Sequence, residues 1–412
     1  MNRIRIAGEE QEYTEDSRDR VFKSTESWLS TLIQSDRMSL LLGSGFTTAL
    51  TNEAGGQPAT MAAHGDFGPL QSNISKRATE RALAVGRSEA NIEDELSAAM
   101  ELLPAIALLE QSQVNALRSG IAEALKGLVS RILEAERSIA EDFAKPDSPT
   151  RMLLQSFLLS FSARPSRSER LGIFTTNYDR VIEFGADMLG LRMIDRFVGS
   201  LSPIFRSSRI DIDMHYNPPG IRGEPRYLEG VIRLTKLHGS VDWFKDERNI
   251  FRTVMPFGYH DDAMNPAESV LVYPNAAKEL ESAAYPYSEL FRDFASAICR
   301  PESALVTYGY GFGDEHVNRV IRDMLAIHST HLVIISYDNA NGRLDTFLRS
   351  LGDLTQVSVL MGPDVASLQT LVASCLPKPA LDPILQREYA LRLRRGHIEP
   401  TDSGSPASDG DA

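Results

Sequence analysis

Short apolar runs alternate with segments of helical spacing through the second half of the chain. The runs are LGIFTT (171–176), VIRLTKL (231–237), SVLVY (269–273), ALVTYG (304–309), HLVIIS (331–336) and QVSVLMG (356–362). Strands that alternate with helices in this way are typical of a parallel sheet with helical crossovers. The pattern therefore predicts an α/β fold with a parallel sheet and helices on both of its faces.

The first half of the chain has a different pattern. A polar start precedes an amphipathic helix expected over Val21–Gln34, and weak periodicity over 50–90 indicates a loop with short helices. From Asn91 to Phe161 the apolar spacing is helical throughout, and we expect this part to cover a ligand crevice. The predicted parts are an N-terminal helical segment (1–36), a sheet domain (37–50 and 165–378), a helical insertion (51–164) and a C-terminal helix with a disordered tail (379–412).

Two segments outside these elements leave alternatives open. Phe197–Tyr227 has no clear period, and a loop of this length closes over a substrate, contacts a partner or is a plain surface excursion. The predicted helix Ile384–Arg395 carries four arginines, which suit either a solvated helix end or a docking segment for another subunit. The tail from Glu399 has few apolar residues and is expected to be disordered.

Polar residues follow the apolar run 171–174 at once, in the sequence Thr-Thr-Asn-Tyr-Asp. A buried strand that ends in this way presents Asn177 and Asp179 at its carboxyl end, where open α/β sheets bind ligands. Helical spacing resumes from Tyr178, so the motif is expected at a strand-to-helix turn.

A glycine turn follows an earlier apolar run, in the sequence LLLGSG (40–45). Glycines at such a turn let backbone amides approach a phosphate. Thr48 stands where a third glycine would complete the dinucleotide-binding pattern, so the turn alone favours an ordinary tight turn over a nucleotide site.

His238 lies near the end of another expected strand, in the sequence KLHGS (236–240). Histidine serves as a general base because its ordinary pKa lies near neutrality. The alternative is a core histidine bonded to a backbone carbonyl, which this motif alone favours.

A second glycine loop, TYGYGFGDEHVN (307–318), breaks a β-rich run and opens a helix. Gly309, Gly311 and Gly313 could cradle a phosphate beside the positive end of the helix. Asp314 could instead cap that helix. Asp314 and His316 could bind a metal, but no third ligand is near them in the sequence, which argues against that reading.

In this order, the four segments resemble the sirtuin-like (silent-information-regulator type) superfamily over about residues 37–340. The segments IFTTNYD, KLHGS, LVYPNAAK and GYGFGDEHVNRVI look closest to the sirtuin-like subunit of bacterial two-component antiphage systems. The resemblance implies a Rossmann-like sheet that binds NAD+. It also implies a homo-oligomer, plausibly a dodecamer, that assembles with a HerA-like hexameric ATPase.

Two departures from the classical deacylases of that superfamily favour hydrolysis of NAD+ by water. Those enzymes carry a four-cysteine zinc module, whereas this chain has only Cys299 and Cys375, so no zinc is expected. The first glycine turn continues as Phe46-Thr47-Thr48 and lacks the stretch that follows it in the deacylases. The implied activity is an NAD+ glycohydrolase that depletes cellular NAD+ as an antiphage effector, under control of its partner.

The resemblance also assigns roles to residues. Asn177 would orient the ribose and the attacking water, His238 would accept a proton, and Asp179 would hold the nicotinamide carboxamide or order the loop of Asn177. The residues expected to contact NAD+ are Gly43, Ser44, Gly45, Phe46, Thr176, Gly309, Gly311, Phe312, Gly313, Asp314, His316, Asn318 and Tyr337. An arginine near the ribose would favour NADP, but the sequence assigns no position to that role.

The composition of the chain bears on its binding partners and on its cellular location. The net charge of −13 disfavours extensive direct binding to nucleic acid, which is expected only through the partner. Two cysteines far apart in the chain and a polar N-terminus suit a cytoplasmic protein without a secretory signal. No apolar run is long enough to cross a membrane.

Two other functions remain open at this stage. A regulatory or scaffold subunit would bind NAD+ or ADP-ribose without hydrolysing NAD+ by itself. A protein deacylase or ADP-ribosyltransferase would release nicotinamide only when an acceptor is present.

Overall fold

The structure is a computed structural model that describes residues 2–59, 65–84, 87, 89–164, 168–209, 212–216, 226–245, 249–259, 285–352 and 354–378. The chain forms two units, Met1–Pro377 and Lys378–Ala412. Lys378 alone is described in the second unit, so the predicted helix Ile384–Arg395 and the tail lie outside the described residues, as does the predicted strand 269–273.

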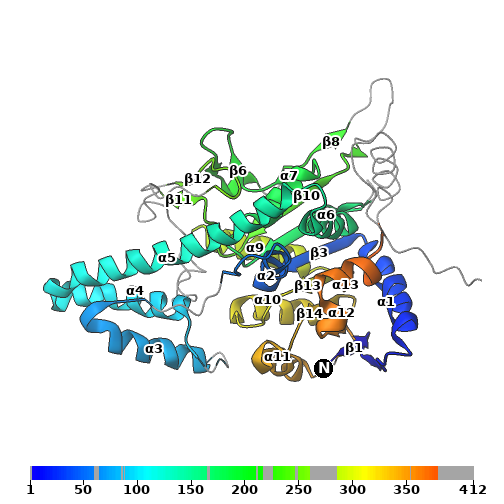
Figure 1. Cartoon of the computed structure of the whole chain (residues 1–412), viewed down its shortest axis with the longest axis horizontal. Coiled ribbons are helices and arrows are strands. Elements are labelled where there is room, and N and C mark those ends of the chain that lie inside the picture. The colour runs from blue at the N-terminus through cyan, green and yellow to red at the C-terminus, as the bar shows by residue number, and fades with distance from the viewer. Residues whose placement is uncertain are drawn as a thin grey trace, which may run out of the picture. The chain divides into compact units, whose positions relative to one another are not determined.

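A nine-stranded sheet forms the centre of the first unit (Figure 1). Its strands pair in parallel except for two antiparallel strands at one edge. The order across the sheet is β2 (Glu9–Gln11), β1 (Arg3–Ile6), β15 (Val357–Met361), β14 (His331–Ser336), β13 (Ser303–Tyr308), β3 (Arg37–Leu42), β4 (Leu171–Thr175), β10 (Val231–Lys236) and β5 (Arg192–Ile194). This confirms the predicted Rossmann-like α/β fold.

The two antiparallel edge strands come from the polar N-terminal residues, to which the sequence assigned no element. Strand β1 pairs with β15, with Arg3 opposite Met361, and turns back into β2. Ile4 is the one residue of β1 that is buried. Backbone pairing with an exposed sheet edge therefore decides this structure, and the hydrophobic pattern alone carries little sign of it.

Helices cover both faces of the sheet, as the alternation of strands and helices predicted. Along β3, Leu40 and Leu42 belong to one hydrophobic core, and Leu41 belongs to the other. The first core includes residues of α1 (Arg18–Ile33), α2 (Ser44–Glu53), α6 (Pro149–Ser162), α7 (Val181–Met188), α12 (Pro363–Ala366), α13 (Leu368–Thr370) and η4 (Leu371–Cys375). The second includes residues of α9 (Tyr287–Ile298), α10 (Glu315–Leu325) and α11 (Arg343–Leu351).

The order of the strands creates a crevice at the carboxyl ends of β3 and β13. Strands β3 and β13 are neighbours in the sheet. The chain continues from β3 to β4 on one side of this pair and from β13 to β14 on the other side. Connections that leave two adjacent parallel strands in opposite directions open a ligand-binding crevice between them.

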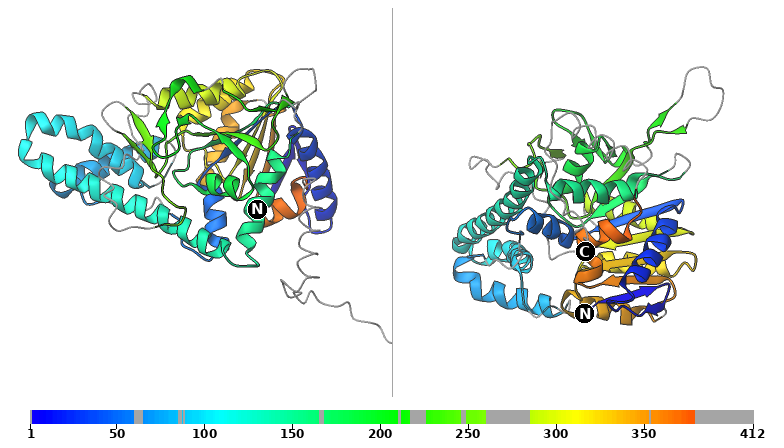
Figure 2. Two further views of the ribbon diagram at one scale, coloured as in Figure 1. Left: turned by 90° about the horizontal axis from the view of Figure 1, so that it is seen from above. Right: turned by 45° about the vertical axis from the view of Figure 1, so that its right-hand side comes forward.

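The helical insertion has a hydrophobic core of its own. Residues of η1 (Gly68–Leu70), α3 (Gln71–Ala84), α4 (Ile92–Leu109) and the long helix α5 (Gln111–Phe143) contribute to this core. Helix α3 is longer than expected for a segment of weak periodicity, because buried Ile74, Ala78 and Ala82 recur at every fourth position. Figures 1 and 2 show α4 and α5 running side by side away from the sheet.

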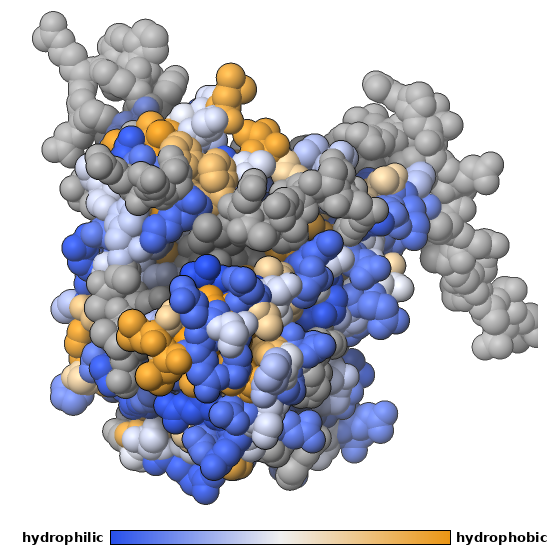
Figure 3. Space-filling model, turned by 90° about the vertical axis from the view of Figure 1, so that its left-hand side faces the viewer, coloured by the Kyte–Doolittle hydropathy of each residue, from blue (hydrophilic) through white to orange (hydrophobic). Residues whose placement is uncertain are grey.

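The far end of the α4–α5 pair reaches solvent. Leu108 and Leu109 are 87% and 80% exposed, whereas residues 92 and 94–99 of α4 are buried. The face of the molecule on this side is mostly hydrophilic, with small hydrophobic patches (Figure 3). The start of α4 is therefore the part of this helix that packs towards the rest of the unit.

Short strands occur in the region that the sequence predicted to be a long loop. Strands β6 (Phe197–Val198) and β7 (Ile204–Phe205) join β11 (Trp243–Lys245) and β12 (Ile250–Arg252) in a four-stranded sheet. After η2 (Ser207–Arg209), β8 (His215–Tyr216) pairs with β9 (Arg226–Tyr227). Among the described residues, no helix has the length and hydrophobicity that a membrane crossing requires.

Candidate functional site

A cleft of about 540 Å³ opens at the carboxyl ends of β3, β4, β10 and β13. Its volume falls within the usual range for small-molecule sites. Nine of the residues singled out from the sequence line it: Gly43, Ser44, Thr176, Asn177, Asp179, His238, Gly311, Gly313 and Asp314. The tertiary structure thus gathers all four sequence motifs in one place.

Asn177 is fixed by two hydrogen bonds at the start of this cleft. Its Nδ2 donates to the backbone carbonyl of Gly43 and to the hydroxyl of Thr47, each at 3.0 Å. A carbonyl oxygen can only accept, so the amide nitrogen must face Gly43. This orientation leaves the amide oxygen of Asn177 as an acceptor for a ligand hydroxyl or a water.

Thr47 links Asn177 to Asp179. Its hydroxyl donates to Oδ2 of Asp179 at 2.7 Å, while Oδ1 of Asp179 accepts from the backbone amide of Val181 at 3.1 Å. Both carboxylate oxygens are therefore engaged in ordering the turn between β4 and α7. Of the two roles expected for Asp179, these bonds favour ordering the loop of Asn177.

Lys236 holds the same turn from the neighbouring strand. This lysine is 3% exposed, and its Nζ donates to the backbone carbonyls of Tyr178 and Asp179 and to the hydroxyl of Ser240. It also forms an ion pair with Glu183 of α7 at 2.9 Å. Burial raises the pKa of the Glu183 carboxyl and the lysine charge opposes this rise.

His238 is paired with Asp314, which comes from the second glycine loop. The Nε2 of His238 lies 2.8 Å from Oδ2 of Asp314. An ionised carboxylate can only accept, so the proton is assigned to Nε2 and the lone pair to Nδ1. This tautomer suits a general base.

Asp314 also caps α10, which was the alternative left open by the sequence. Its Oδ1 accepts from the backbone amides of His316 and Val317. The two roles coexist because each uses a different carboxylate oxygen.

The two glycine turns pack against each other. Gly43 donates its amide to the carbonyl of Tyr308, and Gly45 donates to the carbonyl of Gly309, both at 3.0 Å. Gly309 has a φ of +61°, and a Cβ there would lie 2.6 Å from the backbone nitrogen of Phe46. Close contact between two backbones therefore explains these glycines without any phosphate.

The helical insertion supplies one wall of the cleft, in keeping with the expected covering role. Asn91 caps α4 through a reciprocal pair of hydrogen bonds with Asp94, and Glu93 accepts from the hydroxyl of Tyr178 at 3.2 Å. Burial raises the pKa of the Tyr178 hydroxyl well above its ordinary value, so it remains a donor at neutral pH. From α5, Ile132 and Ala135 complete this wall.

Seven residues expected to contact NAD+ are not among those that line the cleft. Phe46 and Phe312 are core residues, and Asn318 braces the second glycine loop by donating to the carbonyl of Phe312 at 3.0 Å. Tyr337 is 60% exposed beyond the end of β14. The remaining three are Gly45 and Gly309, which pack together, and His316, whose ring lies near that of Phe291.

Several residues of the cleft carry no signal in the sequence motifs. In the sequence, Thr47 stands out only as part of a departure from the deacylase pattern, and Arg87 and Arg343 belong to none of the four motifs. Thr47 follows Gly43 by four residues, the spacing that places it one helical turn into α2. That spacing is the one sequence signal that could have identified it.

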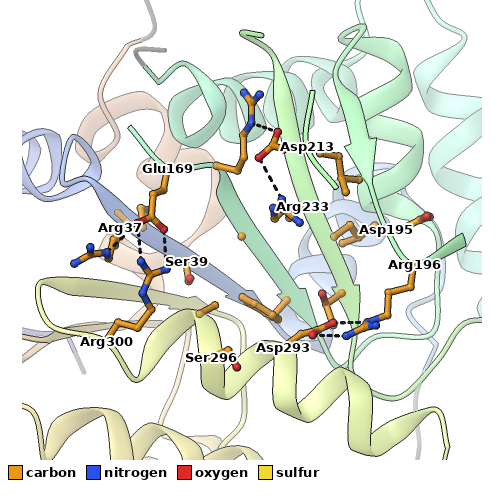
Figure 4. Close-up of a pocket in the computed structure, with 18 residues that line it drawn as sticks. Arg37, Ser39, Glu169, Asp195, Arg196, Asp213, Arg233, Asp293, Ser296 and Arg300 are labelled. Carbon is orange, nitrogen blue, oxygen red and sulfur yellow. Dashed lines mark hydrogen bonds and ion pairs between the residues drawn. The ribbon is translucent and has the colours of Figure 1, made fainter. Parts of the chain in front are cut away.

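A second cavity of about 460 Å³ lies near the amino ends of β3 and β4 (Figure 4). Most of its charged side chains are bonded to one another: Glu169 pairs with Arg37 and Arg300, Asp213 with Arg170 and Arg233, and Asp293 with Arg196, whereas Asp195 pairs with Arg252 outside the lining. It contains no residue of the four motifs. Charges that neutralise each other within the wall favour a structural role for this cavity.

Within the described part of the chain, no group of three or more His, Cys, Asp or Glu side chains is arranged to hold a metal ion. Cys299 and Cys375 are both unpaired, and burial raises the pKa of Cys375 to about 12. A thiol with such a pKa stays protonated at neutral pH and is a poor metal ligand.

Comparison with known families gives one match. The sequence model of the SIR2-like domain matches residues 171–352, from β4 to the end of α11. The match includes Asn177, Asp179, His238 and the second glycine loop, and it supports the sirtuin-like resemblance and a function related to NAD. No curated protein matches the chain.

Proposed function

We propose that this protein hydrolyses NAD+ to nicotinamide and ADP-ribose in the cleft between the two glycine turns. The observation that carries the proposal is the convergence of Asn177 and His238 on one cleft, each fixed by a buried partner. Proteins with a SIR2-like domain are commonly NAD-dependent enzymes, and the match of this domain spans both residues.

Cleavage of NAD+ depends little on an acid catalyst. Nicotinamide leaves as a neutral base and takes the electron pair of the broken bond, so no strong acid is required. The ribose then passes through a transition state of oxocarbenium character, and water forms the new bond to its anomeric carbon. The enzyme has to orient the ribose, place the water and accept one proton.

The side chains of the cleft are suited to these tasks. The free amide oxygen of Asn177 can accept a hydrogen bond from a ribose hydroxyl or from the attacking water. The Nδ1 of His238 can accept the proton of that water, directly or through a ribose hydroxyl. Asp314 would stabilise the imidazolium that results, because its carboxylate lies 2.8 Å from Nε2.

The biological setting is proposed from the sequence resemblance alone. We propose that the hydrolase is an antiphage effector, and that it assembles as a homo-oligomer with a HerA-like hexameric ATPase. Control by a partner is expected because unregulated depletion of NAD+ would kill the cell that makes the enzyme.

The test is NAD+ turnover followed by chromatography, with the protein alone and co-expressed with a HerA-like ATPase. Asn177→Ala and His238→Ala should each abolish the formation of nicotinamide and ADP-ribose. Asn115→Ala on the exposed side of α5 and His328→Ala, which lies outside the cleft, are the matched controls. Binding of NAD+ without turnover in either condition would contradict the proposal and favour a regulatory subunit.

A further inference from the structure

Two arginines face the cleft from segments that the sequence motifs do not include. Arg87 lies in the connection between α3 and α4, and Arg343 is the first residue of α11, directly after η3 (Ala340–Gly342). Both line the same cavity as Asn177 and His238. They therefore bring two positive charges to a site whose other charged groups are the carboxylates Glu93, Asp179 and Asp314.

Only some of the hydrogen-bond donors of the Arg87 guanidinium have partners among the described residues. Its Nη2 donates to Oδ1 of Asp94 at 2.5 Å, which fixes the guanidinium at the start of α4. Its Nη1 is buried and has no hydrogen-bond partner among the described residues. A buried donor without a partner is rare, because leaving it unpaired costs about 1–3 kcal/mol.

Arg343 lies over the second glycine loop. Its Nε donates to the carbonyl of Gly311 at 2.7 Å. A Cβ on Gly311 would lie 3.0 Å from Nη2, and one on Gly313 would lie 3.7 Å from Nε. The absence of side chains at these two glycines therefore makes room for the guanidinium, whose two Nη groups remain to bind a ligand.

The two guanidinium groups also influence each other. Burial lowers the pKa of Arg343, and the positive charge of Arg87 lowers it further. Arginine nevertheless stays protonated, so two like charges face one cavity. An anion bound to both would relieve this repulsion and supply the missing partner of Arg87.

Four of the backbone amides expected to hold the anion are occupied. The amides of Gly43, Gly45, Phe46 and Gly309 donate to the carbonyls of Tyr308, Gly309, Gly43 and Ile335. Two of these bonds join the two glycine turns, one lies within the first turn, and one goes to the end of β14. These four amides therefore do not serve a phosphate in the cleft, whereas the guanidinium fork matches phosphate geometry.

We propose that Arg87 and Arg343 together bind the diphosphate of a nucleoside diphosphate ligand. The inference builds on the proposed function, because it assigns the diphosphate of NAD+ to one part of the cleft and the ribose that reacts to Asn177 and His238. It also predicts that ADP and ADP-ribose bind to the same arginines, whether or not the chain hydrolyses NAD+.

Calorimetric titration with ADP and with adenosine tests the proposal in the whole protein. Arg87→Gln and Arg343→Gln should each weaken ADP binding by tenfold or more and leave adenosine binding unchanged. Arg349→Gln is the matched control on α11, because Arg349 bonds only within its own helix, to Asp345 and Thr346, among the described residues. Thermal unfolding of each variant checks that the fold is retained, and Arg343 has no ion pair whose loss would disturb it among the described residues.

Two results would overturn the proposal. One is ADP affinity in Arg343→Gln equal to that of the wild type. The other is a loss confined to NADP, with ADP and NAD+ binding intact, which would assign the pair to a 2′-phosphate. Arginine-dependent ADP binding without any NAD+ turnover would sustain this proposal and contradict the proposed function, whereas turnover with arginine-independent ADP binding would do the reverse.

Discussion

The Nε2 of His238 lies 2.8 Å from Oδ2 of Asp314, although the two residues come from different strands and stand far apart in the sequence. Asp314 is at the same time the N-cap of α10. One carboxylate therefore fixes the tautomer of the candidate base and the helix that follows the second glycine loop.

Substitution of Asp314 should separate these two roles. Asp314→Asn keeps a good helix cap but removes the charge beside His238, so we expect kcat for NAD+ hydrolysis to fall about tenfold or more with little change in KM. Asp314→Ala should lose about 1 kcal/mol of stability in addition, because the cap is lost. Steady-state kinetics and denaturant unfolding measure the two effects. Full activity in Asp314→Asn would show that the charge is not needed.

Thr47 is expected to matter as much as the residues of the motifs. Thr47→Val removes the hydroxyl between Asn177 and Asp179, and leaves both with an unmet hydrogen bond. We expect a loss of about 1–3 kcal/mol in stability and a fall in NAD+ turnover of about tenfold, because Asn177 loses one of the two hydrogen bonds that hold its amide. Thr47→Ser retains the hydroxyl and should stay close to wild type. A loss in Thr47→Ser with Thr47→Val close to wild type would point to the methyl group instead.

The contact between the glycine turns predicts a steep stability difference between two glycines. Gly309→Ala places a Cβ against the backbone of Gly45 and Phe46 at a φ of +61°, and should cost about 3 kcal/mol or more. Gly55→Ala has a similar φ of +72° but no atom of the described residues within 4 Å, so about 1 kcal/mol is expected. Chemical denaturation compares the two. Similar losses would mean that the turns separate easily.

His331 predicts how stability depends on pH. Burial lowers its pKa from 6.5 to about 4, and its Nε2 lies 2.9 Å from the hydroxyl of Ser358. Between pH 6.5 and about pH 4, the unfolded chain takes up a proton on His331 that the folded chain does not, so acid favours unfolding. The histidine should thus cost up to about 3 kcal/mol of stability as pH falls from about 6.5 to 4, and nothing above about 7.

His331→Gln checks this dependence, because glutamine can bond to Ser358 but does not titrate. Urea unfolding of both proteins between pH 4 and pH 7.5 should show a shallower acid loss in the variant. Parallel curves for the two proteins would show that His331 is not the group responsible.

The sequence by itself determined the fold class and the main residues of the candidate site. Runs such as 304–309 and 331–336 are apolar throughout, and such runs predict strands buried on both faces. The polar residues after 171–174 lie at a strand end, and the carboxyl ends of neighbouring parallel strands meet at one edge of a sheet. Asn177, Asp179 and His238 were placed correctly at this edge for that reason, because their position depends on the strand that carries them.

The tertiary structure alone decided which partners these residues have. Thr47 is joined to Asp179, and Asp314 to His238, across strands that the sequence places far apart. The glycine turns were expected to face a phosphate, yet they pack against each other, because close contact of two backbones requires glycine as much as a ligand does. Arg87 and Arg343 belong to no motif and reach the cleft only through the packing of the insertion and of α11. Local pattern fixes the strand that carries a residue, whereas contacts between distant segments depend on how the whole chain packs.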